Sequence, residues 1–100
     1  MRLEYLKSVR SGLRRDIKKY LRENHESVQN QFHILVSNEI LSLNKDAFGK
    51  WIMEFAPRFQ KQRKNAGEHA ELIDLITEYV CAEHNIILTE NKVRANLSQL

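Results

Sequence analysis

The feature that most constrains the fold of this chain is an aromatic-rich stretch from Leu43 to Phe59. It contains the one Trp, the one Pro and three of the four Phe of the 100-residue sequence. Large apolar side chains recur in it at intervals of one, three and four residues, which places them on one face of a helix. These side chains are Phe48, Trp51, Ile52, Phe55 and Phe59. Because aromatic residues bury a large apolar area each, the other elements are expected to pack around this face.

Both ends of this predicted helix have sequence signals. Asn44 stands at the N-cap position, and Asp46 falls in the first turn, where an acidic side chain favours the helix start. Pro57 lacks a backbone donor and crowds the preceding turn. We therefore expect a kink or a stop near Ala56.

Further helices are predicted on both sides of the aromatic stretch. Apolar residues at helical spacing favour helices over residues 2–23, 26–43, 48–59 and 68–84, with a short last helix after Thr89. Breaks are expected at Asn24 and at Asn85, which tolerates the left-handed conformation, and a polar linker over residues 60–67. The sequence thus predicts an all-α fold: a compact bundle of four to five helices in a single domain over residues 1–100.

Composition and motifs narrow the possible functions. No apolar run approaches the ~20 residues that span a bilayer, and the basic start is not followed by an apolar signal core, so we expect a cytoplasmic protein with no membrane partner. The single Cys81 fits a reducing compartment. The four His and the one Cys show no close ligand pair, and no phosphate loop or nucleophile motif is present. The expectation is a non-enzymatic protein without a metal or a cofactor.

The charges are strongly segregated along the chain. The segment 2–22 has eight cations against Glu4 and Asp16, and the segment 58–64 has four cations and no acid. The segment 68–90 has six acids and no Lys or Arg. Such segregation indicates either pairing within the fold or a partner surface. If the first explanation holds, the face formed by Arg10, Arg14 and Lys18 should lie within ion-pair reach of the face formed by Glu71, Asp74 and Glu78.

The C-terminal segment from Tyr79 to Leu100 resembles the helix-turn-helix of bacterial regulators. Val80 and Ala82 are the small or apolar residues of a first helix, Asn85 takes the turn position, and a second helix reads Lys-Val-Arg-x-x-Leu-x-x-Leu. The resemblance implies that Lys92 and Arg94 face a DNA groove, together with Asn96 and Gln99. A C-terminal helix that closes the bundle is the alternative interpretation of the same residues.

A second resemblance covers seven residues. Arg63 and His69 are separated by five residues, as in the Arg-x(4–6)-His motif of HEPN-type ribonucleases. The resemblance implies that these two side chains act on an RNA phosphate. A surface or core role of His69 is the alternative.

The leading hypothesis from these patterns is a small non-enzymatic regulator that binds nucleic acid, DNA rather than RNA. The candidate phosphate- and base-contacting residues are Arg10, Arg14, Arg15, Lys18, Lys19, Arg58, Lys61, Arg63, Lys92 and Arg94. The competing hypothesis is a protein-binding adaptor or inhibitor, alone or as a homodimer, that uses the segregated basic and acidic helices.

Overall fold

The computed structural model describes residues 2–65 and 67–98, and this part of the chain is helical without any strand. The elements are α1 (Arg2–Phe32), α2 (Asn38–Leu41), α3 (Lys45–Lys61), the 3-10 helices η1 (Arg63–Asn65) and η2 (Gly67–His69), and α4 (Ala70–Ser98). The predicted all-α bundle is confirmed.

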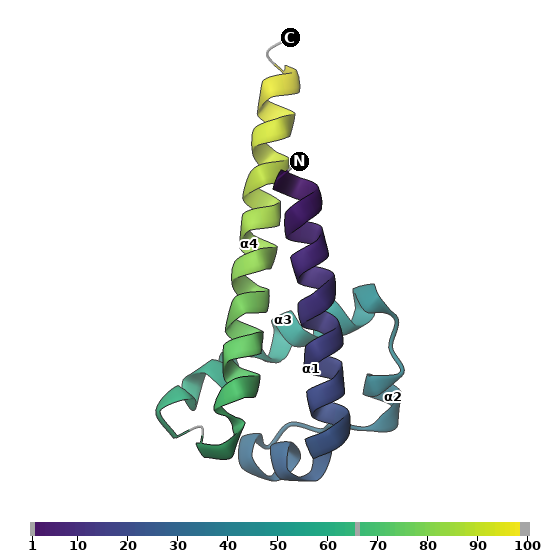
Figure 1. The fold of residues 1–100 in the computed structure, drawn as a ribbon, viewed down its shortest axis with the longest axis vertical. Helices are drawn as coiled ribbons and strands as arrows, with labels where there is room; N and C mark the ends of the chain where they lie inside the picture. Colours follow the sequence, from purple (N-terminus) through teal and green to yellow (C-terminus); the bar gives the residue numbers. More distant parts are fainter. Residues whose placement is uncertain (1, 66, 99–100) are drawn as a thin grey trace.

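The two long helices α1 and α4 form an antiparallel hairpin (Figure 1). The shorter helix α3 packs against the base of this hairpin, and α2 lies beside it in the connection from α1. The last turns of α4 extend past the beginning of α1, so the molecule is elongated, with extents of 53 × 29 × 19 Å. The apolar stripes of α1 and α4 meet along the hairpin, and their lower halves also contact α3.

The aromatic face of α3 lies in the core, as the sequence predicts. Phe48, Trp51, Ile52 and Phe59 are buried, whereas Phe55 is half-buried at the edge. The ring of Trp51 stacks on Phe48 at 5.7 Å between centroids and contacts Phe55 at 5.3 Å. Asn44 caps the helix as predicted, because its side-chain oxygen accepts the Ala47 N–H at 2.9 Å.

The predicted break at Asn24 is confirmed as a kink, at which two helical segments of α1 meet. Asn24 has non-helical backbone angles (φ −133°, ψ 23°), and α1 resumes after it and runs to Phe32. Its side-chain amide donates to the Tyr20 carbonyl at 3.0 Å, which satisfies an acceptor at the bend. The short polar side chain therefore stabilises the break between the two helical segments.

The predicted second helix over residues 26–43 is confirmed only as far as Phe32, and its continuation to Leu43 is wrong. His33 adopts a left-handed conformation (φ 54°) and ends α1, and residues 34–37 are non-helical before Ser37 caps the short α2. Ile34 and Val36 are buried while Leu35 is exposed, which is the two-residue alternation of an extended segment. Closely spaced apolar residues do not distinguish this pattern from a helix that is buried on most sides.

Pro57 does not stop α3, which continues to Lys61. The exposed ring of Pro57 leaves only one carbonyl of the previous turn without its helical donor, and buried Ala56 and Phe59 anchor the helix on both sides. The predicted linker over residues 60–67 is mostly structured, since η1 and η2 occupy much of it.

The predicted turn at Asn85 is also wrong, and this removes the helix-turn-helix. α4 is one helix from Ala70 to Ser98. Thr89 does not cap a new helix, because its hydroxyl donates back to the Asn85 carbonyl at 2.7 Å within α4. Tyr79, Ala82 and Ile86 are buried and form one uninterrupted stripe through the supposed turn. Packing against α1 favours continuation of the helix over the weak left-handed preference of a single Asn.

Candidate nucleic-acid interface

Four of the ten predicted cations come together on one side of the lower hairpin. Arg10, Arg14, Arg15 and Lys18 project from α1 toward the beginning of α3. Two further cations that the prediction missed, Lys45 and Lys50, join them from α3. The remaining six predicted cations lie elsewhere.

A pocket of about 320 Å³ lies between α1 and the first turn of α3. We call it the basic pocket, because it has four cations and no carboxylate in its wall. Its lining residues are Ser11, Arg14, Arg15, Lys18, Lys45 and Phe48. Phe48 supplies an apolar wall, and Ser11 supplies a hydroxyl. An excess of positive charge in a concave, partly desolvated site raises the local concentration of anions.

Lys18 is held in place at the edge of the basic pocket. Its Nζ donates to the Leu43 carbonyl at 3.0 Å and lies 4.8 Å from the centroid of the Phe48 ring. The connection before α3 and the ring of Phe48 thus fix the position of this ammonium group. A cation–π contact leaves the charge uncompensated, so Lys18 keeps its attraction for an anion.

Arg14 is the most unusual residue of the site, because its residue surface is only 8% exposed. Its Nη2 donates to Ser11 Oγ at 3.2 Å. Within the described residues, no carboxylate lies within 4.0 Å of its guanidinium nitrogens. Buried guanidinium groups are costly unless a carboxylate or another anion compensates them. Arg14 therefore adds an uncompensated buried charge to the pocket wall.

The hydroxyl of Tyr79 from α4 reaches the same place and lies against buried Gly49 of α3. Burial is the largest factor that raises the pKa of Tyr79, and the negative charge of Glu83 raises it further. Arg14 lowers the pKa of Tyr79 by its charge and by a hydrogen bond to the hydroxyl. Tyr79 thus supports Arg14 as a neutral partner that does not cancel its charge.

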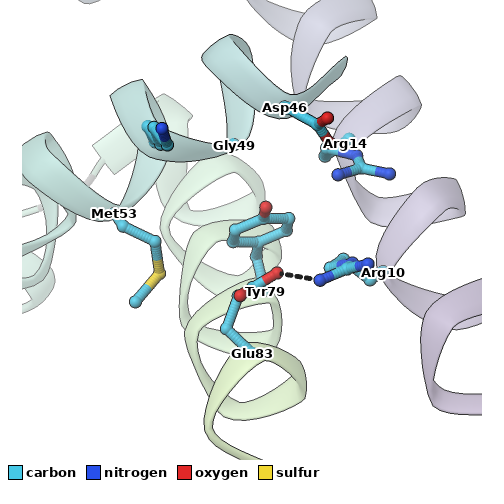
Figure 2. A pocket seen from close by; sticks show the side chains of 8 residues that line it. Arg10, Arg14, Asp46, Gly49, Met53, Tyr79 and Glu83 are labelled. Carbon is cyan, nitrogen blue, oxygen red and sulfur yellow. Dashed lines mark hydrogen bonds and ion pairs between the residues drawn. The ribbon is translucent and has the colours of Figure 1, made fainter. Parts of the chain in front are cut away.

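A second pocket, of about 440 Å³, shares the Arg14 wall (Figure 2). Its charge is mixed, so we call it the mixed pocket. It is lined by Arg10, Arg14, Asp46, Gly49, Lys50, Met53, Tyr79 and Glu83. Arg10 pairs with Glu83 at 2.9 Å, and its buried Nε has no hydrogen-bond partner. The carboxylates offset much of the positive charge here, which makes the basic pocket the better anion site.

The predicted pairing between the basic and acidic helices is not found. The structure joins Arg10 to Glu83, but it joins neither Arg14 nor Lys18 to an acid of α4 within 4.0 Å in the described part of the chain. The exposed carboxylate of Glu71 lines a different pocket, on the side of α1 that presents Asp16 and Tyr20. Apart from Arg10, the basic face is therefore left without an ion pair to α4 in the described residues, which favours an external anion.

Three groups of predicted cations lie away from the basic pocket. Lys19 is on the Asp16 side of α1. Arg58 donates to the His33 carbonyl at 3.2 Å and lies 5.9 Å from the Phe55 ring centroid, so it has a structural role. Lys61 and Arg63 are exposed at and beyond the far end of α3. That end lies roughly 25 Å from the start of α3, at about 1.5 Å per residue.

Lys92 and Arg94 are exposed on the part of α4 that extends beyond α1. Because α4 has no turn, they do not belong to a recognition helix buttressed by a second helix. Asn96 is exposed on the same part of α4, and Gln99 lies outside the described residues. The base-reading role that the sequence predicts for this segment loses its structural basis.

His69 is part of a buried hydrogen-bond network. Its Nδ1 lies 2.7 Å from the Tyr20 hydroxyl and its Nε2 lies 2.7 Å from Ser27 Oγ, which itself donates to Glu68 at 2.7 Å. Only 1% of the His69 surface is exposed. Burial, followed by the charges of Glu71 and Glu68, raises the pKa of Tyr20 and keeps its hydroxyl protonated.

This network joins the region of the α1 kink to the start of α4. His69 therefore has a structural role, which we call the clamp: it holds these two segments together. Protein groups engage both ring nitrogens of His69, whereas Arg63 is exposed on η1. Neither hydrogen bond of the ring involves Arg63. The geometry therefore does not favour the ribonuclease motif, in which the two side chains act together on one phosphate.

The sequence indicated the cations that α1 contributes to the site, but not the cations of α3. The cations of α1 gave a signal, because their spacing of four residues puts them on one face. Lys45, Lys50 and Gly49 gave no signal, because they are far from the α1 cations in sequence and meet them only through packing. No pattern in the sequence indicated a role for the Tyr79 hydroxyl.

No group of three or more His, Cys, Asp or Glu side chains in the described ranges could hold a metal ion. None of the described helices is both long and apolar enough to cross a membrane. Comparisons of the chain with protein-family models, with curated proteins and with solved structures found no significant match.

Proposed function

We propose that this protein is a non-enzymatic nucleic-acid binder that holds the sugar–phosphate backbone in the basic pocket. The observation that supports the proposal is a pocket wall with four cations and no carboxylate, formed by Arg14, Arg15, Lys18 and Lys45. Phosphate groups are the anions that such clusters of Lys and Arg bind in nucleic acids.

The chemistry of the pocket suits a phosphate oxygen. The guanidinium of Arg14 offers directed donors, and the ammonium groups of Lys18 and Lys45 offer mobile ones. Lys45 and Phe48 stand at the start of α3, so the positive end of this helix borders the pocket. A bound phosphate would also compensate the buried charge of Arg14.

The proposed mode of binding is independent of base sequence. The continuous α4 provides no recognition helix, and the cations of the basic pocket contact backbone phosphates only. Duplex DNA, the nucleic acid that the sequence favours, is the first probe, and single-stranded RNA is the second.

The test is an electrophoretic mobility shift or fluorescence anisotropy titration across a salt series. If all four cations contact phosphates, the slope of log K against log salt should be about −3.6 on duplex DNA, at about −0.9 per contact. The test variant is Arg15→Gln with Lys45→Gln, since both side chains are exposed. It should weaken all sequences alike and reduce the slope to about −1.8.

The matched control is Lys61→Gln with Arg63→Gln, which removes the same charge from exposed positions outside the pocket. It should have a smaller effect on the slope. Equal effects of the two double variants would show that only net charge matters and would reject the pocket. If neither nucleic acid binds at low salt, about 50 mM, the proposal fails and an acidic protein partner becomes the explanation of the patch.

A further inference from the structure

Exposed apolar side chains gather on the upper part of the hairpin. Of the six large apolar residues that are exposed in the described structure, all but Leu35 belong to this region. These five are Tyr5, Ile87, Leu88, Val93 and Leu97. A helix end with apolar residues on several sides is typical of a surface that is covered in an assembly.

One face of this helix end also has opposite charges at regular spacing. Ile87, Glu90, Arg94 and Leu97 follow one another at intervals of three, four and three residues, which places them on the same side of α4. We call this the 87–97 face. Ile87 is 50% exposed and Leu97 is 64% exposed, so neither is covered by α1 or α3.

We propose that the 87–97 face binds a second copy of this chain in an antiparallel, two-fold arrangement. When a second copy runs in the opposite direction, each apolar residue of the face lies opposite an apolar residue, and the acid lies opposite the base. With the axis at the level of Lys92, each Ile87 meets Leu97 of the second copy, and each Glu90 meets its Arg94. The same register thus joins apolar side chains to apolar ones and acids to bases at all four positions.

Lys92 itself does not oppose this pairing. It lies two residues from both Glu90 and Arg94, about 160° away around the helix at 100° per residue, and therefore points away from the axis. The contact covers about three turns, or roughly 15 Å of helix, so it lies at the small end of specific interfaces. We expect a weak, concentration-dependent dimer.

The experiment is sedimentation equilibrium of the full chain over a concentration series, with Glu90→Arg and Arg94→Glu as separate variants. Each variant alone places like charges opposite one another twice across the axis, and should lower the association constant at least about tenfold. A mixture of the two variants restores opposite charges at both contacts, and should associate more tightly than either variant alone.

Glu78→Arg is the matched control, because Glu78 is an exposed acid on another side of α4. It should leave association unchanged. Circular dichroism of each variant checks that the helix content is retained. Because the mixture contains the same two variants, recovered association shows that their loss of association does not come from misfolding. A wild-type chain that stays monomeric at about 1 mM, or an association that both variants and their mixture leave unchanged, overturns the proposal.

Discussion

The contact between Gly49 and Tyr79 allows a sharp test of the packing at the site. In an exposed helix, replacing Gly by Ala stabilises by about 1 kcal/mol. At Gly49, however, the added Cβ would clash with the Tyr79 hydroxyl and would lie 3.7 Å from two atoms of Arg14. The Tyr79 hydroxyl stands at the end of a rigid, buried ring, so relieving the clash requires the whole ring to move.

We therefore expect Gly49→Ala to destabilise the fold. Overpacking of a buried site costs about 1–3 kcal/mol, and the gain in helix propensity offsets about 1 kcal/mol of that cost. The net loss should be up to about 2 kcal/mol. In Tyr79→Phe the clashing oxygen is absent. Gly49→Ala should then be tolerated in the Tyr79→Phe background.

Urea unfolding of the four chains of this double-mutant cycle measures the coupling, which should favour the double variant by at least about 1 kcal/mol. Gly12→Ala is the control, because a Cβ there meets nothing closer than Arg15 Nη2 at 3.8 Å. It should stabilise α1 by about 0.5–1 kcal/mol. If Gly49→Ala is as stabilising as Gly12→Ala, the result contradicts the close contact between the Tyr79 hydroxyl and Gly49 of α3.

Three further predictions concern stability. Trp51→Ala should cost about 3–5 kcal/mol by urea unfolding, because it removes a buried ring that contacts three other aromatic rings; a loss below about 1 kcal/mol would contradict a core role. His69→Ala should cost about 2–3 kcal/mol, since it removes one hydrogen-bond partner from each of the Tyr20 and Ser27 hydroxyls, and an unchanged midpoint would refute the clamp. The raised pKa of Tyr79 means that the unfolded chain loses its phenolic proton first, so stability should fall as the pH rises above about 10, and less so in Tyr79→Phe.

The sequence by itself determined the helical class and the core of the fold. Apolar spacing located the aromatic face of α3, and Asn44 marked its start, because these signals act within one or two turns of the same helix. It did not determine where helices end. Pro57 and Asn85 each have a local preference against the helix, and packing of the flanking apolar residues kept the helix going past both.

Only the tertiary structure decided which charges form the candidate site. The cations of α1 share a face by helical spacing, but their acid-free pocket exists because α3 brings Lys45 and Phe48 against them. The burial of Arg14 beside the Tyr79 hydroxyl depends on three helices meeting at Gly49. Such contacts join residues that are distant in the chain, so no local pattern of charge or hydrophobicity encodes them.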